Sequence, residues 1–329
     1  MTARSATLND VARLAGVSYQ TVSRVLNTPH QVADATRDKV AAAMQQLNYI
    51  PNRVAQQLAG KQSRTLGLAT SDLALLAPAQ IASAIQHSAA AAGYRLVIAM
   101  GSRGTAADTV SELLAQRVDG LLINLPLAAG EAETLQQRCG EKPVLFLDTE
   151  EQAAVAKSLY PAYVGAQLAV DHLVALGHQR IGILNGPADS VAAQARFAAW
   201  QQALAQHSLL AECVLQGDWS AASGYDAIAA HPLLPQALLV ANDQMALGAM
   251  RALHQRGIAI PQQMSLIGYD DTAESAWYQP ALTTVRQDLQ QLGAVSVTRI
   301  VAQLQGEKQT EEALKATLII RETTDRPVN

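Results

Sequence analysis

The sequence predicts an α/β protein in which a small all-helical headpiece precedes a core of doubly wound parallel sheets. Apolar residues in the first fifty positions recur at helical spacing. Beyond residue 63, short runs with the composition of buried strands alternate with longer stretches rich in Ala, Leu and Gln, as in parallel sheets covered by helices on both faces. At 329 residues the chain can form two or three domains with a large core.

The headpiece begins with two short helices on either side of a glycine turn. Thr7 and Asp10 have the spacing of a capping arrangement for the first helix, and Ser18 is a natural N-cap for the second. Gly16 lies between the helices, where a turn needs an unhindered backbone. These features predict a helix-turn-helix, the motif that places its second helix in the major groove of DNA.

The second helix carries polar side chains on its outer face. Tyr19, Gln20 and Arg24 lie opposite the apolar Val22 and Leu26. Gln pairs with adenine and Arg with guanine in the major groove, so these residues are candidates for reading bases. Six short hydrogen-bonding side chains suit contacts to phosphates: Thr7, Ser18, Thr21, Ser23, Asn27 and Thr36. Taken alone, the same pattern also fits an ordinary solvated helix pair.

A third helix is expected over residues 34–47, and Pro51 then breaks the chain. Residues 52–60 form a further helical segment that is too short to be stable by itself. This segment can become ordered against DNA or a partner chain, and the apolar Leu58 suits a wedge between base steps in the minor groove. The alternative interpretation is a plain linker helix.

Charge is divided unevenly along the chain. Residues 1–62 hold seven Lys or Arg against three Asp, a net charge of +4, whereas the whole chain carries −4 and the remainder therefore −8. A basic headpiece on an acidic body is typical of nucleic-acid binding. Cys139 and Cys213 lack the spacing of a disulfide framework or zinc site, and we expect neither a metal nor a cofactor. The absence of a signal peptide and of long apolar runs predicts a cytoplasmic, nucleoid-associated protein without membrane contact.

The core is expected to contain two sheets. Buried-strand runs occur at residues 65–69, 95–100, 120–124, 144–147, 180–184, 237–240, 265–269 and 316–320. So many strands suggest two lobes with a cleft between them, and ligands in open α/β sheets bind at the C-terminal ends of the strands.

Crossings between the lobes are placed near residues 160–163, 286–290 and 316–318. The predicted domains are the headpiece (1–51), a hinge helix (52–62) and the core (63–329). The core divides into an N-lobe of about 63–161 and 289–316 and a C-lobe of about 162–288 and 317–329.

Polar residues occur where such a cleft needs them. Asp148, Asn242 and Asp270 each follow a predicted strand, Arg196 begins a helix after a loop, and Trp219 lies in another loop. Carboxylate, amide and guanidinium groups match sugar hydroxyls, and an indole covers the apolar face of a pyranose ring. Each residue alone also fits a structural role such as a helix cap, but several together favour a sugar site.

The chain closely resembles the lactose/galactose repressor family of bacterial transcription regulators. The resemblance rests on the runs VSYQTVSRV and LNYIPNRVAQQLAGKQS in the headpiece and hinge, and recurs in HLVALGH, GDWSA, LLVANDQMALGAMRA, GYDDT and LTTVRQD in the core. It spans nearly the whole chain and is interrupted around 101–112, 126–142, 149–166 and after 304. It implies a two-lobed core like that of sugar-binding periplasmic proteins, a periplasmic-binding-protein-like fold.

The resemblance also implies roles for individual residues. Tyr19, Gln20 and Arg24 would read the bases of double-stranded operator DNA. The hinge and minor-groove residues would be Asn52, Ala55, Gln56 and Leu58. The inducer contacts would be Leu75, Ala77, Pro78, Ile81, Asp148, Tyr160, Arg196, Trp219, Asn242, Asp270, Gln287 and Leu292. The implied function is a sugar-responsive repressor that binds a palindromic operator as a homodimer and is released by a galactoside inducer.

Several positions depart from the family pattern. Tyr160 and Leu289 stand where Phe is usual, and Ala192 replaces a pocket Ser. A His–Asp ion pair between the lobes cannot form between Leu76 and Glu274. The other departures are Gln86 for an interface Lys, Gln31 for a His near the phosphates and Ala33 for a helix-capping Ser.

The last residues differ from the tetrameric members of the family. Residues 320–329 hold no leucine heptads, so the C-terminal tetramerisation helix is expected to be missing. A dimer is expected, because two headpieces at a fixed spacing read a palindrome.

No enzyme motif is present: the sequence has no P-loop, no GxGxxG after a strand and no nucleophile elbow. His172 and His178 lack the spacing of two ligands on one helix face and are interpreted as structural. Two alternatives remain. One is a paralogous repressor that responds to another sugar or a purine, and the other is a sugar-binding protein that does not bind DNA.

Overall fold

The computed structural model describes residues 6–49, 63–307 and 314–327, and these residues fall into two compact units. One unit is Met1–Ser63, which contains the headpiece, and the other is Arg64–Asn329, here called the core.

The headpiece is a bundle of three short helices around a small apolar centre. Its elements are α1 (Leu8–Ala15), α2 (Tyr19–Asn27), the 3₁₀ helix η1 (Pro29–Gln31) and α3 (Asp34–Gln46). Val11 on α1, Val22 on α2 and Val40 on α3 are fully buried against one another. The helix-turn-helix predicted from the sequence is therefore confirmed.

Local hydrogen bonds fix the ends of the first two helices as the sequence predicts. Thr7 and Asp10 form a capping box, in which the Thr7 hydroxyl donates to Asp10 Oδ2 at 2.6 Å. The Ser18 Oγ accepts from the Thr21 N–H at 3.1 Å. Gly16 ends α1 with φ +66°, a left-handed conformation that glycine adopts without strain. At the third helix, Ala33 supplies no side-chain cap.

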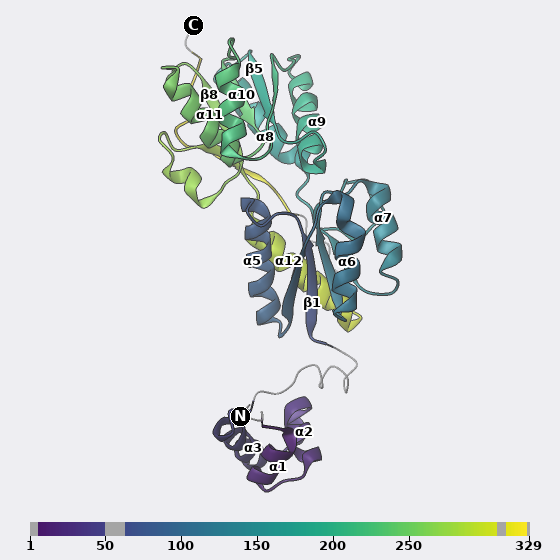
Figure 1. Ribbon diagram of the computed structural model, residues 1–329. Coiled ribbons are helices and arrows are strands. Elements are labelled where there is room, and N and C mark those ends of the chain that lie inside the picture. Colours follow the sequence, from purple (N-terminus) through teal and green to yellow (C-terminus); the bar gives the residue numbers. More distant parts are fainter. Residues whose placement is uncertain (1–5, 50–62, 308–313, 328–329) are drawn as a thin grey trace. The chain divides into compact units, whose positions relative to one another are not determined.

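The first lobe of the core is a four-stranded parallel sheet in the order β2-β1-β3-β4. Its strands are β1 (Thr65–Thr70), β2 (Arg95–Met100), β3 (Gly120–Asn124) and β4 (Val144–Phe146). The helices are α5 (Leu76–Ala91), α6 (Ala106–Ala115), α7 (Ala129–Arg138) and α12 (Leu289–Gln305), and η2 (Arg103–Thr105) precedes α6. Leu122 on β3 packs into the layer under α5 and α12, whereas its neighbours Leu121 and Ile123 pack under α6 and α7, so helices cover both faces (Figure 1).

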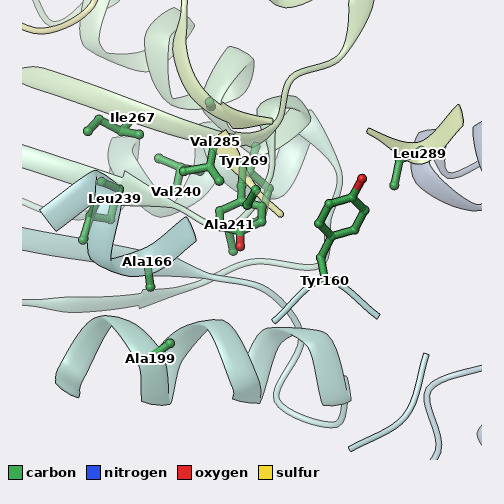
Figure 2. Packing of buried hydrophobic residues seen from close by; sticks show 14 of the residues in the cluster. Tyr160, Ala166, Ala199, Leu239, Val240, Ala241, Ile267, Tyr269, Val285 and Leu289 are labelled. Carbon is green, nitrogen blue, oxygen red and sulfur yellow. The ribbon is translucent and has the colours of Figure 1, made fainter. Parts of the chain in front are cut away.

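The second lobe is a six-stranded sheet in the order β10-β9-β8-β7-β5-β6. Its strands are β5 (Ile181–Asn185), β6 (Val214–Gln216), β7 (Ala237–Val240), β8 (Ser265–Asp270), β9 (Thr283–Arg286) and β10 (Thr317–Ile319). The helices are α8 (Ala162–Leu176), α9 (Val191–Gln206), α10 (Ala221–Ala230) and α11 (Asp243–Gln255), with the 3₁₀ helix η3 (Ala273–Trp277) after β8. Figure 2 shows strand residues such as Val240 and Val285 packed near Ala166 of α8 and Ala199 of α9.

Three segments connect the two sheets. The chain leaves the first sheet after β4 and enters the second lobe at α8, and it returns after β9 to α12, which packs on α5, β3 and β4. It then crosses once more to β10, which pairs with β9. We call the segment around residues 160–161 the first crossover and the segment 287–288 the second crossover.

The structure corrects four details of the predicted sheets. The final strand β10 runs antiparallel to β9, although only parallel pairing was expected. Residues 95–100, expected as a buried strand, form the sheet edge β2, where Ile98 is 40% and Met100 63% exposed. Two strands were missed. The three-residue β6 has alternating exposure, and the threonines of β9 look polar in sequence but are buried with their hydroxyls bonded.

Replacing Gly248 by Ala is expected to weaken the contact between α10 and α11, which lie side by side in Figure 1. A Cβ atom at residue 248 would lie 2.7 Å from the backbone nitrogen of Tyr225 and even closer to the carbonyl oxygen of Ala221. Neither group can withdraw unless a helix moves. We expect the free energy of unfolding, measured by urea denaturation, to fall by about 1–3 kcal/mol.

Gly130→Ala is the matched control, because its Cβ would meet no atom within 4 Å and the residue lies in α7. This variant should gain up to about 1 kcal/mol from helix propensity. Equal effects in the two variants would contradict the packing argument.

Candidate functional site

A cleft of about 860 Å³ lies between the two lobes of the core, at the C-terminal ends of their strands. Asn124 ends β3, Asp148 follows β4, Asn242 follows β7 and Asp270 ends β8, and all four border the cleft. This is the edge at which open parallel sheets bind ligands, because the helices that follow the strands leave a crevice there.

The cleft contains every residue that the sequence predicts as an inducer contact. Its lining includes Leu75, Ala77, Pro78, Ile81, Asp148, Tyr160, Arg196, Trp219, Asn242, Asp270, Gln287 and Leu292. These residues come from both lobes and from both crossovers, so their assembly depends on the tertiary fold rather than on any one segment.

Arg196 is the centre of the polar side of the cleft. It lies on α9, and its Nη2 donates to Asp270 Oδ1 and to Gln287 Oε1, each at 3.1 Å. Its Nη1 donates to the carbonyl oxygen of Ala241. The guanidinium also lies 4.0 Å from the ring centroid of Tyr269, a cation–π contact. With these contacts the cation is held rigidly and can still face a ligand.

Asp270 sits at a strained strand end. Its φ is +101°, and the following Asp271 has φ +55°. Asp271 is anchored by Arg286 Nε and Arg321 Nη2, each 2.6 Å from its carboxylate. Burial raises the pKa of Asp270, and the charge and hydrogen bond of Arg196 oppose that rise. The carboxylate is thus held in place with one strong donor.

Asp148 lies at the edge of the cleft in the first lobe. Burial raises its pKa to about 6, while the positive charge of Arg196 acts in the opposite direction. Asn124 ends the neighbouring strand, and its Nδ2 donates to Thr70 Oγ1 at 3.3 Å. The sequence argument missed Asn124, although the rule that selected Asp148, a polar residue at a strand end, applies equally to it.

Asn242 and Trp219 form a structural pair within the cleft wall. The Asn242 Oδ1 accepts from the Met245 N–H at 2.8 Å and so caps α11, and its Nδ2 donates to the Trp219 carbonyl at 3.0 Å. The Trp219 indole lies against Gly186, where a Cβ atom would collide with the ring. Asn242 therefore has the helix-capping role that the sequence left open, in addition to its place in the cleft.

Asp243 is a buried carboxylate that the sequence argument missed. Its oxygens accept from Thr272 N at 2.9 Å, Ser275 Oγ at 2.6 Å and Thr284 Oγ1 at 2.6 Å. Burial raises its pKa to about 7, and these hydroxyl and amide donors lower it. The carboxylate lies over β8 at Gly268 and ties the loop after Asp270 to Thr284 on β9. No sequence signal distinguishes this residue from an ordinary first-turn acid.

The apolar side of the cleft is built mainly by two helix starts. Leu75, Ala77, Pro78 and Ile81 come from the beginning of α5, and Leu292 comes from the first turn of α12. Such a wall offers dispersion contacts and no hydrogen bonds, so a ligand that is polar on one face and apolar on the other fits the cleft.

The headpiece presents the predicted base-reading residues to solvent. Tyr19, which is 51% exposed, Gln20 and Arg24 lie on the outer face of α2, whereas Val22 is fully buried. Among the predicted phosphate contacts, Thr7, Ser18 and Thr21 also take part in the helix caps. Thr36 lies in the first turn of α3 and Ser23 on α2. The side chain of Asn27 and the predicted hinge residues Asn52, Ala55, Gln56 and Leu58 lie outside the described part of the structure.

The two histidines considered as possible ligands make structural contacts. His172 Nε2 lies 3.0 Å from Thr324 Oγ1, and His178 Nε2 lies 2.8 Å from the carbonyl oxygen of Asp325, which supports the structural interpretation of both histidines. Within the described residues no cluster of His, Cys, Asp and Glu could hold a metal ion. In the same residues no helix is long and apolar enough to cross a bilayer.

Comparison with known proteins identifies the family. Residues 7–52 match the model described as bacterial regulatory proteins, lacI family, and residues 170–324 match a periplasmic binding protein-like domain. The chain is 47% identical to the lactose operon repressor of Escherichia coli (strain K12) over 328 residues, which cover 98% of this chain and 91% of that protein.

The chain belongs to the lacI family of bacterial regulatory proteins.

Two further relatives agree with this assignment. The lactose operon repressor of Klebsiella pneumoniae is 41% identical over 98% of this chain and 93% of its own length. The crystal structure of the lac repressor dimer bound to operator and the anti-inducer ONPF superposes with a TM-score of 0.93 at 46% identity, covering 98% of this chain and all of that one. The family member described here is accordingly a DNA-binding transcriptional repressor and not an enzyme.

Replacing Asp148 by Asn is expected to change how stability depends on pH. The pKa of Asp148 is about 6 in the folded protein and about 3.8 without burial. Between these values the folded state binds a proton that the unfolded chain has released, so the contribution of this group to stability falls as pH rises from 4 to 6. The variant lacks this contribution and should lose less stability than the wild type between pH 4.5 and 7 in urea titrations. The same loss in both proteins would contradict the assigned pKa.

Proposed function

We propose that this protein is a galactoside-responsive repressor of the lactose-operon type, which binds a palindromic operator as a homodimer and is released by the sugar. The single observation that carries the proposal is that all twelve predicted inducer contacts line one cleft between the lobes. The relatives named above, which are lactose operon repressors, support the choice of a galactoside over other sugars.

The sugar is proposed to bind between the polar and apolar walls. The carboxylates of Asp148 and Asp270 accept hydrogen bonds from hydroxyls, and Arg196 and the amides of Asn242 and Gln287 donate. Trp219 covers the apolar face of the pyranose ring, and the aliphatic residues at the start of α5 contact the opposite side. The amide oxygen of Asn242 caps α11 and one amide hydrogen is donated to the Trp219 carbonyl, which leaves the second amide hydrogen for the ligand.

DNA binding is assigned to the headpiece. Tyr19, Gln20 and Arg24 are proposed to contact base edges in the major groove, since they form the exposed face of α2. The capping and turn residues around them are proposed to contact phosphates. Residues 52–62 are proposed as the hinge that orders in the minor groove. In this scheme residues 1–51 are the headpiece domain and 63–329 the sugar-binding and dimerisation core, working at the nucleoid in the cytoplasm.

The switch is proposed to have two states. Without sugar, the lobes of the two protomers hold the hinges close enough to fold on the operator. Sugar in the cleft favours another relation of the lobes, so the hinges separate and operator affinity falls. The sugar must bind the two states unequally for this to occur.

A titrated operator-binding assay tests the function. The purified full chain is bound to a labelled lactose-operon operator and titrated with methyl β-galactoside, isopropyl β-thiogalactoside, lactose, glucose, ribose, cellobiose and guanine. We expect release by the galactosides alone. Release by ribose, cellobiose or guanine instead would identify a paralogous repressor, and failure to bind any operator would favour a sugar-binding protein that does not recognise DNA.

Replacing Arg24 by Ala is expected to lower operator affinity by about 1–3 kcal/mol and to relax the preference for guanine at one position. The reason is the loss of two donors from an exposed arginine on the recognition helix. Fluorescence anisotropy with the operator, single-base variants and random DNA measures both effects. An equal loss on operator and random DNA would show that Arg24 contacts only phosphates.

Replacing Asp270 by Asn is expected to abolish release by galactosides while operator binding stays near the wild-type level. The substitution replaces an anionic acceptor by a neutral amide, so Arg196 loses the carboxylate partner that lies 3.1 Å away. Calorimetry with isopropyl β-thiogalactoside checks the binding, and Asp226→Asn on the exposed side of α10 serves as a matched control. Unchanged galactoside affinity in the Asp270 variant would remove this residue from the site.

A further inference from the structure

One hydroxyl group joins two of the three segments that connect the lobes. Tyr160 lies in the first crossover, immediately before α8, and its side chain is largely buried. Its hydroxyl donates to the carbonyl oxygen of Asp288 at 2.9 Å and lies 3.4 Å from Gln291 Oε1. Asp288 belongs to the second crossover and caps α12 through its own carboxylate. Figure 2 shows the Tyr160 ring extending from its segment, with Leu289 near its hydroxyl end.

The same contact continues into the polar side of the cleft. Gln287, the residue before Asp288, accepts from Arg196 Nη2 at 3.1 Å, and the same nitrogen donates to Asp270 at 3.1 Å. The proposed sugar contacts Asp270 and Arg196 are therefore connected by hydrogen bonds to Gln287 in the second crossover. The next residue, Asp288, is bonded through the Tyr160 hydroxyl to the first crossover.

We propose that the Tyr160 hydroxyl is a positioning group that makes the two crossovers move together when sugar binds at Arg196. The inference rests on the proposed galactoside-responsive function and extends it to the transmission of the signal. Without the hydroxyl, a displacement of Gln287 would move only the second crossover, and the first crossover would not be coupled to it.

The chemistry of the group suits this role. Burial raises the pKa of Tyr160 to about 12, and the charge of Asp288 adds to the rise, so the phenol remains a proton donor at neutral pH. The Asp288 carbonyl also accepts from the Leu292 N–H at 2.9 Å as part of α12. Removal of the phenol oxygen therefore leaves no buried acceptor without a partner, and a Phe variant is expected to fold.

The test compares Tyr160→Phe with Tyr163→Phe in the full-length protein. Tyr163 is a matched control, because its hydroxyl accepts from Gln206 Nε2 at 3.2 Å within the second lobe and joins no crossover. The measured quantity is the ratio of operator dissociation constants with saturating isopropyl β-thiogalactoside and without it. Saturation removes any effect of altered sugar affinity from the ratio.

We expect Tyr160→Phe to reduce this ratio about threefold to tenfold, the equivalent of one hydrogen bond, and Tyr163→Phe to leave it at the wild-type value. Thermal unfolding confirms that each variant is folded. A wild-type protein that does not respond to the sugar would refute the proposed function rather than this inference. A responding wild type with equal ratios in all three proteins would overturn the inference, as would a Tyr160 variant that only needs more sugar for the same ratio.

A double-mutant cycle separates transmission from simple stabilisation. If the signal passes from Gln287 to Tyr160, the effects of Gln287→Ala and Tyr160→Phe on the ratio are not additive, because the second change acts on a connection that the first has already broken. Additive effects would overturn the proposed path.

Discussion

The cleft depends on the contacts that hold Arg196 beside the buried carboxylates of Asp148 and Asp270. Burial raises the pKa of both Asp148 and Asp270, and the guanidinium opposes that rise at both, so the cation sets the charge of the acidic side. An arginine in this position needs its donors satisfied, because an unpaired buried donor costs more free energy than a hydrogen bond returns. Asp270, Gln287 and the Ala241 carbonyl accept from three of its five N–H groups, and the Tyr269 ring covers one face of the group. The cleft is polar on one side because this one cation organises it.

The sheet makes that arrangement possible by bringing distant strand ends to one edge. Two side chains of the cleft wall also approach the backbone closely, and each approach requires a glycine. Gly268 on β8 leaves room for the Asp243 carboxylate, which ties the loop after Asp270 to β9, and Gly186 leaves room for the Trp219 indole. The positive φ of Asp270 is tolerated because strand pairing with β9 fixes the backbone before it, and Asp243 and the ion pairs of Asp271 fix the backbone after it. Local strain at the cleft is thus balanced by buried polar contacts around Asp270.

These relations explain which parts of the molecule could be predicted from sequence. The headpiece follows from contiguous patterns: a capping pair, a glycine turn and a helical stripe are all short-range signals. The strand-end residues Asp148 and Asp270 were found because a parallel sheet gathers such positions, and Asn124 was overlooked although it meets the same rule. β9 was missed because buried threonines look polar until their partners are known. The roles of Asp243 and of the Tyr160 hydroxyl depend on segments about thirty or more residues away, whose contacts no single-sequence pattern reveals.

The departures from the family pattern also have a physical consequence for the relation of the lobes. Leu76 lines the cleft from α5 and Glu274 is exposed on η3, so these two positions cannot supply an ion pair. The described contacts near the crossovers include hydrogen bonds to backbone carbonyls, such as Tyr160 to Asp288 and Arg299 Nη1 to Lys157 at 2.6 Å. Exposed ion pairs are screened by salt, whereas buried hydrogen bonds are affected much less. These contacts of the crossover segments are short and largely buried, so their strength is set by geometry more than by ionic strength.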